Sequence, residues 1–280
     1  MYRESSTKCP QQQGWQADLT LEYEEKCVGN DTKTIVSKRR HRGPLTVQRA
    51  FYPEPDGTCH SYLLHPPAGL VGGDSLNIDL VLHPGAKAVL TTPGATRFYK
   101  STGHQATLTQ KFSIADKAYI EWLPQETLIY DRARTKVTSE FHLHGSAQFF
   151  GWEILGFGRP ASGEDFTNGE IDFYLQVFRD KRLCLRERLA STGLPSGLHG
   201  HRGTMTLIAS GSTPAALETA RELCSESKLI AAPTLIEDLL IVRGLASDCE
   251  PLNKLCRQLW RSIRPQLSQR DAYAPQIWRT

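Results

Sequence analysis

The sequence predicts a mainly β protein, built as a layered or coiled sheet and completed by two α-helices in the last quarter of the chain. Two observations support this fold class. Short segments in which apolar and polar residues alternate recur about every 8–12 residues between turn signals, a spacing typical of sandwiches and coiled sheets. Apolar residues at helical spacing occur only after residue 210.

The first strands are expected to pair as a hairpin. Residues 15–23 and 32–37 have strand character, and Asn30 and Asp31 between them supply a turn. Extended structure is expected again over residues 42–53. Further strands of the first half are expected at 75–82, 87–92, 105–114 and 118–123.

The second half of the chain adds strands before helices appear. Strands are expected at 135–143, 148–155, 204–209 and 239–242, and a hairpin is expected with arms 170–177 and 182–189. Thr213 is suited to cap a first helix whose first residue is Pro214. A second helix is expected to begin at Pro251 and to stop before Pro265, because proline interrupts helical hydrogen bonding.

Length and composition suggest a cytoplasmic globular protein with one domain, residues 15–280, after a disordered tail over residues 1–14. The 280 residues are 39% hydrophobic and 22% charged, and the formal charge of +3 favours neither nucleic acid nor an anionic membrane as a partner. No apolar run approaches the roughly 20 residues of a membrane helix. The polar N-terminus has no signal-peptide core.

Two further features of composition have simple interpretations. The basic run at residues 38–42 suits either a solvated strand end or contact with phosphate or an acidic partner. The seven cysteines include no Cys-x-x-Cys pair, so reduced thiols are expected rather than a disulfide framework or a zinc ribbon.

The motifs of several enzyme classes are missing from the chain. It has no Gly-x4-Gly-Lys-Ser/Thr, no Gly-x-Gly-x-x-Gly after a strand, no Gly-x-Ser-x-Gly and no His-Glu-x-x-His. His142 and His144 are expected on one strand face, as metal chelation requires, but no third ligand is visible nearby. His199 and His201 lie on a glycine-rich loop, from which no geometry can be inferred.

The most distinctive stretch is YLLHPPAGLVGGD, residues 62–74. Its prolines exclude helix, and its last two glycines permit a positive φ or the close approach of another segment. We expect a stiff loop that holds Asp74 in a defined place. The residues expected to form and brace this loop are His65, Pro66, Pro67, Gly72 and Gly73.

Carboxylates are the side chains best suited to chemistry here. Glu153 lies within an apolar strand, where a carboxylate is unfavourable unless it is paired or functional, and Arg159 is its expected partner. Two such carboxylates facing one pocket would suit glycoside hydrolysis, whereas a series of them would pass a divalent cation along a wet interior. Spacing alone does not decide between these chemistries.

Seven strings along the chain are distinctive when they are taken together. They are GPLTVQRAFYPE (43–54), YLLHPPAGLVGGD (62–74), TTPGATRFYK (91–100), EWLPQETLIY (121–130), GWEI (151–154), GRPASGE (158–164) and PQIWRT (275–280). In this order and spacing they resemble the family of urease accessory protein D, also called UreD or UreH. The resemblance covers about residues 15–280.

The resemblance implies a non-catalytic chaperone that binds urease apoprotein subunits and the accessory proteins F and G, of which G is a GTPase. The assembly would support lysine carbamylation and nickel insertion in urease. The implied fold is a set of layered, helically arranged β-sheets with two helices and a wet internal passage for nickel. No tightly bound cofactor, nucleic acid or membrane partner is implied. The acids that match the family strings, and that become candidates for lining or bracing a transient nickel path, are Asp74, Glu121, Glu126, Glu153 and Glu164.

Two other functions stay open on the sequence alone. A carboxylate-dependent hydrolase would need two of these acids facing one pocket at roughly 5–9.5 Å. A nickel store would be built on His142 and His144. For Asp74 itself, a place beside an interior path and a place at a partner surface are both open.

Overall fold

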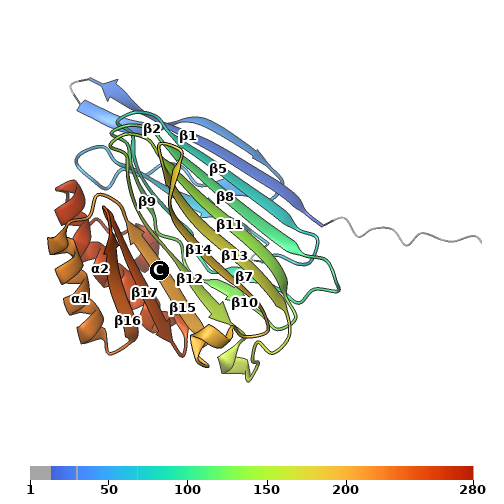
Figure 1. The fold of residues 1–280 in the computed structure, drawn as a ribbon. Coiled ribbons are helices and arrows are strands. Elements are labelled where there is room, and N and C mark those ends of the chain that lie inside the picture. Colours follow the sequence, from blue (N-terminus) through green and yellow to red (C-terminus); the bar gives the residue numbers. More distant parts are fainter. Residues whose placement is uncertain (1–13, 30, 68, 280) are drawn as a thin grey trace, which may run out of the picture.

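Two β-sheets lie face to face, and two α-helices pack on one side of the molecule against the second sheet (Figure 1). The computed structural model describes residues 14–29, 31–67 and 69–279. The expected tail, residues 1–14, lies outside the described residues apart from Gly14. Gly14 packs so closely on Gly73 that a Cβ at position 14 would lie 2.1 Å from the carbonyl carbon of Gly73.

The first sheet has seven strands in the order β14-β13-β11-β8-β5-β1-β2. They are β1 (Gln16–Val28), β2 (Asp31–Arg42), β5 (Ser75–Leu82), β8 (Ala106–Ile114), β11 (Arg134–Leu143), β13 (Glu170–Arg179) and β14 (Arg182–Thr192). Both predicted hairpins are confirmed, because β1 pairs antiparallel with β2 and β13 pairs antiparallel with β14. The neighbours from β1 through β5, β8 and β11 to β13 pair in parallel.

The second sheet has ten strands, eight of them in the order β16-β17-β15-β12-β9-β6-β4-β3, with β10 paired to β12 and β7 paired to β10. They are β3 (Thr46–Val47), β4 (Cys59–Leu64), β6 (Lys87–Thr91), β7 (Thr96–Phe98), β9 (Tyr119–Trp122), β10 (Thr127–Ile129), β12 (Gln148–Phe157), β15 (Gly203–Ala209), β16 (Ile230–Ile236) and β17 (Leu239–Ala246). The strands β4, β6, β9 and β12 are parallel, and the three C-terminal strands join antiparallel.

The chain coils between the sheets. It passes from β5 in the first sheet to β6 in the second, back to β8, on to β9, back to β11 and on to β12. Each return places a new strand parallel to the previous one in the same sheet. The prediction of layered, helically arranged sheets with two helices near the C-terminus is therefore confirmed.

Two apolar layers hold the sheets and helices together. Leu76, Ile78 and Leu80 of β5 are buried between the sheets, as their alternation with polar residues predicts. In β12, Phe149 belongs to this inter-sheet layer, whereas its neighbour Phe150 belongs to the layer under the helices. Strand β12 is thus buried on both faces, which explains why its sequence is more apolar than the others.

The helices are α1 (Pro214–Ser227) and α2 (Cys249–Ser268). Helix α1 starts as predicted, with the Thr213 hydroxyl accepting the Ala216 N–H. Helix α2 differs at both ends: it begins at Cys249, where Asp248 accepts the Glu250 N–H at 3.0 Å, and it continues past Pro265. Pro265 falls in the last turn, where it removes only one N–H donor, so the helix tolerates it.

Some elements lack a sequence signal strong enough to predict them. Strands β3, β7 and β10 have only two or three residues, and β16 contains Pro233 at the edge of its sheet, where proline breaks no central ladder. Short 3-10 turns lie at η1 (Pro160–Ser162), η2 (Ser196–Leu198) and η3 (Gln276–Arg279). Among the described residues, no helix is both long and apolar enough to cross a bilayer.

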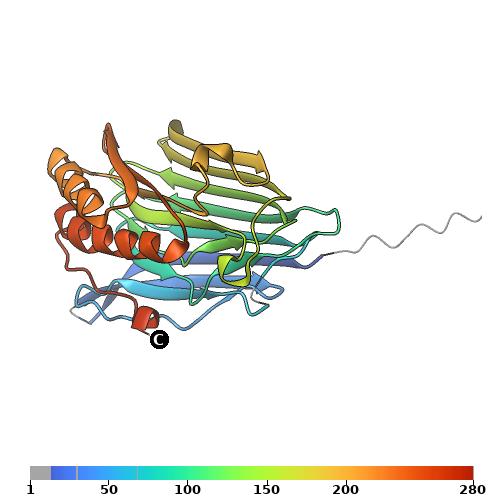
Figure 2. The same cartoon turned by 90° about the horizontal axis from the view of Figure 1, so that it is seen from below.

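The C-terminal segment returns to the body of the molecule. Figure 2 shows η3, beside the label C, next to the blue N-terminal part of the chain. The Gln276 N–H donates to the Tyr62 hydroxyl at 3.0 Å. The Trp278 ring packs against Trp152 and Trp260, at centroid distances of 6.0 and 5.4 Å. The last turn is thereby tied to both β12 and α2.

Candidate functional site

The loop after β4 is stiff, as its prolines and glycines predict. Its backbone pairs with β7 and the residue that follows it, because the Leu70 N–H donates to the Arg97 carbonyl and the Tyr99 N–H donates to the Leu70 carbonyl. Gly73 has a φ of +98°, and a Cβ at Gly72 would lie 2.3 Å from Ser101 Oγ. Both glycines are therefore required by the local backbone.

Asp74 closes this loop from inside. Its Oδ1 accepts the Trp15 N–H and its Oδ2 accepts the Val71 N–H, each at 2.8 Å. The residue is only 6% exposed. The prediction that the loop holds Asp74 in a defined place is confirmed by this geometry. Because both carboxylate oxygens bind backbone N–H groups, Asp74 braces the loop and does not line the cavity described next.

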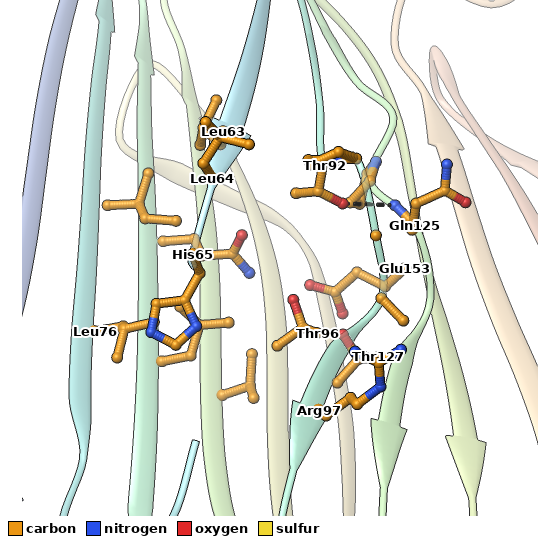
Figure 3. Close-up of a pocket in the computed structure, with 18 of the residues that line it drawn as sticks. Leu63, Leu64, His65, Leu76, Thr92, Thr96, Arg97, Gln125, Thr127 and Glu153 are labelled. Atoms are coloured by element: carbon orange, nitrogen blue, oxygen red, sulfur yellow. Dashed lines mark hydrogen bonds between the residues drawn. The ribbon is translucent and has the colours of Figure 1, made fainter. Parts of the chain in front are cut away.

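A cavity with a volume of about 560 Å³ lies between the two sheets. Apolar residues form most of its wall, and the polar side chains that join them are His65, Thr92, Thr96, Arg97, Gln110, Gln125, Thr127 and Glu153. Figure 3 shows the Glu153 carboxylate pointing into this space, with His65 on the opposite wall. Burial lowers the pKa of His65, partly opposed by Asp74, so its imidazole is neutral near pH 7.

Glu153 is the polar centre of the cavity wall. The Ser139 hydroxyl donates to Glu153 Oε1, and Gln110 Nε2 in turn donates to Ser139 Oγ at 3.1 Å. Burial raises the pKa of Glu153 to about 7, and the hydrogen bond from Ser139 only partly opposes this shift. The carboxyl group is therefore divided between its protonated and ionised forms near neutral pH.

The expected ion pair between Glu153 and Arg159 is wrong. Gly158 has a φ of +77° and turns the chain outward, so that Arg159 lies at the surface. There its Nε donates to Glu164 Oε2 at 3.2 Å. Glu153 thus keeps neutral hydrogen-bonding partners only.

A second cavity of about 160 Å³ meets the first one at Glu153. Leu155 and Phe173 also line both cavities. On its other walls the second cavity is bounded by Glu187 of β14 and Arg243 of β17, which form an ion pair between the two sheets. The two cavities therefore adjoin at three residues, of which Glu153 is the only one with a titratable side chain.

Glu121 faces the opposite side of the second sheet, under helix α2. It accepts the Trp260 indole N–H at 2.6 Å and the Arg264 Nε–H at 2.5 Å. Arg264 Nη2 also donates to both oxygens of Glu54 at 2.7 Å, and His60 Nε2 lies 2.8 Å from Glu54 Oε1. Burial alone would lower the pKa of Arg264, but Glu121 and Glu54 raise it, so the group stays charged. This buried network fastens α2 to the sheet.

The remaining two candidate acids lie elsewhere. Glu126 is half-buried between β9 and β10, and its Oε2 accepts a hydrogen bond from Asn253 of α2 at 2.9 Å. Glu164 pairs with Arg159 at the surface, and this hydrogen bond lowers the pKa of Glu164. Of the five acids, Glu153 alone lines the two interior cavities. The hydrolase alternative needed two of them in one pocket, and their dispersal removes it.

The histidine pairs are placed apart from the cavities. His142 stacks on Phe178 with ring centroids 4.7 Å apart, and His144 Nδ1 lies 3.9 Å from Asp180. His199 is at the end of η2 in the left-handed region, with a φ of +49°. Within residues 14–29, 31–67 and 69–279, no group of three or more His, Cys, Asp or Glu side chains is placed to hold a metal ion.

The cysteines and the basic run also have clear places. Six described cysteines are free thiols, and Cys9 lies outside the described residues. The basic run at residues 38–42 forms the end of β2, an edge strand, where Lys38 pairs with Glu22 and Arg42 lies 3.9 Å from Asp18. Charged side chains on an exposed edge oppose unwanted strand pairing.

Sequence reasoning missed the residues that support the acids. Ser139, Gln110 and Arg264 were not singled out, because their contacts join elements that are separated by 14, 29 and 143 residues of sequence. For Arg264, an unusual cation on the apolar face of α2 was the only available hint.

The fold and the cavities define a β-rich protein with a mainly apolar cavity between two sheets, in which the candidate acids are dispersed rather than gathered in one pocket. The sequence profile of the UreD urease accessory protein family matches residues 16–279, and the chain belongs to this family. It is 40% identical to a urease accessory protein UreD of Alcanivorax borkumensis, over 99% of this chain and 97% of that protein. It is 42% identical to the one from an Azoarcus species, over 96% and 95% of the two chains, and 39% identical to that of Klebsiella aerogenes, over 97% and 99%. The relatives are thus named as accessory proteins of urease rather than as enzymes, as the resemblance implied.

Proposed function

We propose that this chain is a cytoplasmic scaffold for urease maturation, which binds urease apoprotein subunits and the accessory proteins F and G. In this proposal nickel is a cargo that passes through the interior route, and no cofactor is held tightly. The observation that supports the route is the meeting of two cavities at Glu153, inside a member of a urease accessory family.

The chemistry of the route suits a cation in transit. Carboxylate and neutral imidazole groups bind divalent nickel, but one carboxylate with scattered polar groups holds it far less tightly than a closed set of His and Cys ligands. Rapid passage requires binding that is favourable enough to enter and weak enough to leave. Glu153 and His65, on facing walls of one cavity, provide two such groups.

Omitting this chain gives the broadest test of the proposal. Urease subunits are co-expressed with the F and G proteins and with or without this chain, and the nickel content and activity of the purified urease are measured. We expect nickel-loaded, active urease only when the chain is present. Full activation in its absence would contradict the proposal.

Glu153→Gln tests the route specifically. The amide keeps the size of the side chain but cannot ionise, so the proposed route loses its one cation-binding carboxylate and we expect urease nickel content to fall by about tenfold. Co-purification of the variant with its partners should be unchanged. Glu222→Gln, at an exposed position of α1, is the matched control and should load nickel normally. Normal loading by a folded Glu153→Gln protein would exclude this carboxylate from the route.

Asp74→Ala and Glu126→Ala should also reduce urease activation, for a different reason. Asp74 braces the loop that follows β4, and Glu126 ties the β9–β10 connection to α2. We expect both variants to lose stability together with activation, which thermal unfolding would detect. A loss of activation with unchanged stability would instead show that these acids contribute to maturation by something other than bracing the fold.

A further inference from the structure

A basic hollow lies at one end of the molecule, outside the interior route. Tyr99 follows β7, Tyr130 follows β10 and Arg159 follows β12, and these three strands are neighbours in the same sheet. Because the strands are parallel, their carboxyl ends meet at one edge, and the hollow of about 430 Å³ opens there. Lys100 and Arg132 complete the basic part of its lining.

The two acids of the hollow are already fully used within the protein. Asp131 Oδ1 accepts the backbone N–H groups of Thr167 and Asn168 at 3.0 and 2.8 Å. Glu164 accepts the Asp131 N–H through one oxygen and pairs with Arg159 through the other. These bonds hold the loops together, and the two carboxylates offset only part of the positive charge of the three cations in the hollow.

The cations of the hollow retain free hydrogen-bond donors. Lys100 is exposed and has no ion-pair or hydrogen-bond partner among the described residues. Arg132 uses only its Nε, at 3.4 Å from Asp131 Oδ2. The Arg159 guanidinium lies 4.9 Å from the centre of the Tyr130 ring, and Tyr99 packs edge-on against the same ring. The hollow therefore combines mobile and fixed cations around an aromatic wall.

The loop of residues 62–74 packs on Tyr99 of this hollow and also carries apolar surface of its own. A Cβ at Gly69 would lie 2.2 Å from the Tyr99 ring, so only glycine lets that ring take its place. Next along the loop, Val71 is 47% exposed, and Trp15 is 59% exposed. Asp74 binds the backbone N–H of both residues and so holds the two apolar side chains at the surface together.

We propose that the basic hollow, together with Trp15 and Val71, is the docking surface for an acidic segment of a protein partner. Carboxylates of that segment bind Lys100 and Arg132, and an apolar side chain beside them covers Trp15 and Val71. This inference rests on the proposed function, because it names the chemistry of one partner in the maturation assembly. In this proposal Asp74 positions residues of a partner surface, Trp15 and Val71, and does not line the interior path.

A peptide fits this surface better than a nucleic acid does. The hollow has three cations and two acids, so its net positive charge is small. Nucleic-acid sites instead carry an extended positive surface that contacts many phosphates. Exposed tryptophan and valine beside isolated cations match a segment that mixes acidic and apolar residues.

The test uses Lys100→Glu, Arg132→Glu and the double variant in the full chain. Each protein is titrated separately with urease apoprotein, F and G, and the dissociation constants are measured at two salt concentrations. We expect the double variant to bind one partner at least tenfold more weakly than the unchanged chain. An excess of octaglutamate peptide should compete with that partner, and octaglutamine should not.

Lys111→Glu is the matched control, since Lys111 is exposed on β8, which belongs to the other sheet, and it does not line the hollow. It should bind all three partners normally. Lys100→Glu alone keeps the test decisive if Arg132→Glu fails to fold, because Lys100 has no structural contacts to lose. Equal binding by the folded variants and the unchanged chain overturns the docking proposal only. If the unchanged chain binds none of the three partners, the proposed function fails as well.

Discussion

Glu153 is the residue at which the two interior cavities meet, and its surroundings leave it able to titrate. Its strand is apolar, its hydrogen-bond donor is a neutral serine, and the arginine six residues later lies at the surface. Burial without a compensating cation raises the pKa of a carboxyl group. This accounts for a pKa of about 7 and for a carboxylate that can exchange a proton for a cation.

Glu153 should make the free energy of unfolding depend on pH. The folded pKa of about 7 is above the ordinary value of 4.5, so the folded state keeps a proton that the unfolded chain releases between these pH values. Stability from this group therefore falls as pH rises through that window. Glu153→Gln removes the effect, and its stability relative to the unchanged chain should rise by about 2 kcal/mol from pH 5 to pH 8.

Urea unfolding at several pH values measures this difference. Glu222→Gln, on the exposed face of α1, should show no such trend. A stability difference between Glu153→Gln and the unchanged chain that stays constant from pH 5 to pH 8 would show that Glu153 has an ordinary pKa.

Helix α2 is fastened to the second sheet by one buried cation between two buried acids. Arg264 is fully buried and binds Glu54 and Glu121, which come from distant parts of the chain. These contacts also hold the last helical turn in place beyond Pro265. Local signals predicted the start of α1 because Thr213 and Pro214 act within their own turn. The end of α2 was not predictable locally, because the contacts that stabilise it are made over 140 residues or more of sequence.

Arg264→Met should destabilise the fold strongly. Methionine fills much of the same space but leaves Glu54 and Glu121 buried without a cation, and breaking a buried ion pair in this way costs about 3–5 kcal/mol. Arg261→Met, one turn earlier at an exposed position, should change stability by less than about 0.5 kcal/mol. Thermal or urea unfolding distinguishes the two. Equal small effects would mean that the network does not anchor the helix.

At the scale of the whole molecule, the coil of the chain creates the interior. Each full turn of this coil adds a strand to each sheet. The cavity of about 560 Å³ lies where side chains from the facing sides of the two sheets leave space between them. Alternation in the sequence predicted most strands and both hairpins, because it reports which side of a strand is buried. It could not predict parallel pairing or the cavities, since these depend on which distant strands become neighbours.

The same limit applies to the candidate site. Glu153 was singled out correctly as an unusual acid in an apolar strand, but its partner Ser139 comes from the facing sheet. The glycine and proline pattern predicted a stiff loop around Asp74, whereas its apolar surface at Trp15 and Val71 emerged only from the fold. The family resemblance covered nearly the whole chain and therefore anticipated the architecture better than any single motif did.

We propose that nickel reaches urease through the place where the two cavities adjoin, and a variant that fills this place tests the proposal most directly. Leu155 lines both cavities, so Leu155→Trp should obstruct the route. Ile230→Trp, at a position that is 61% exposed on β16, is the control of equal bulk. The nickel content of urease is measured after assembly with each variant, with folding and partner binding checked in the same samples. The account predicts normal complexes in both cases and a loss of at least fivefold in nickel for Leu155→Trp alone; full nickel loading through the obstructed protein would contradict it.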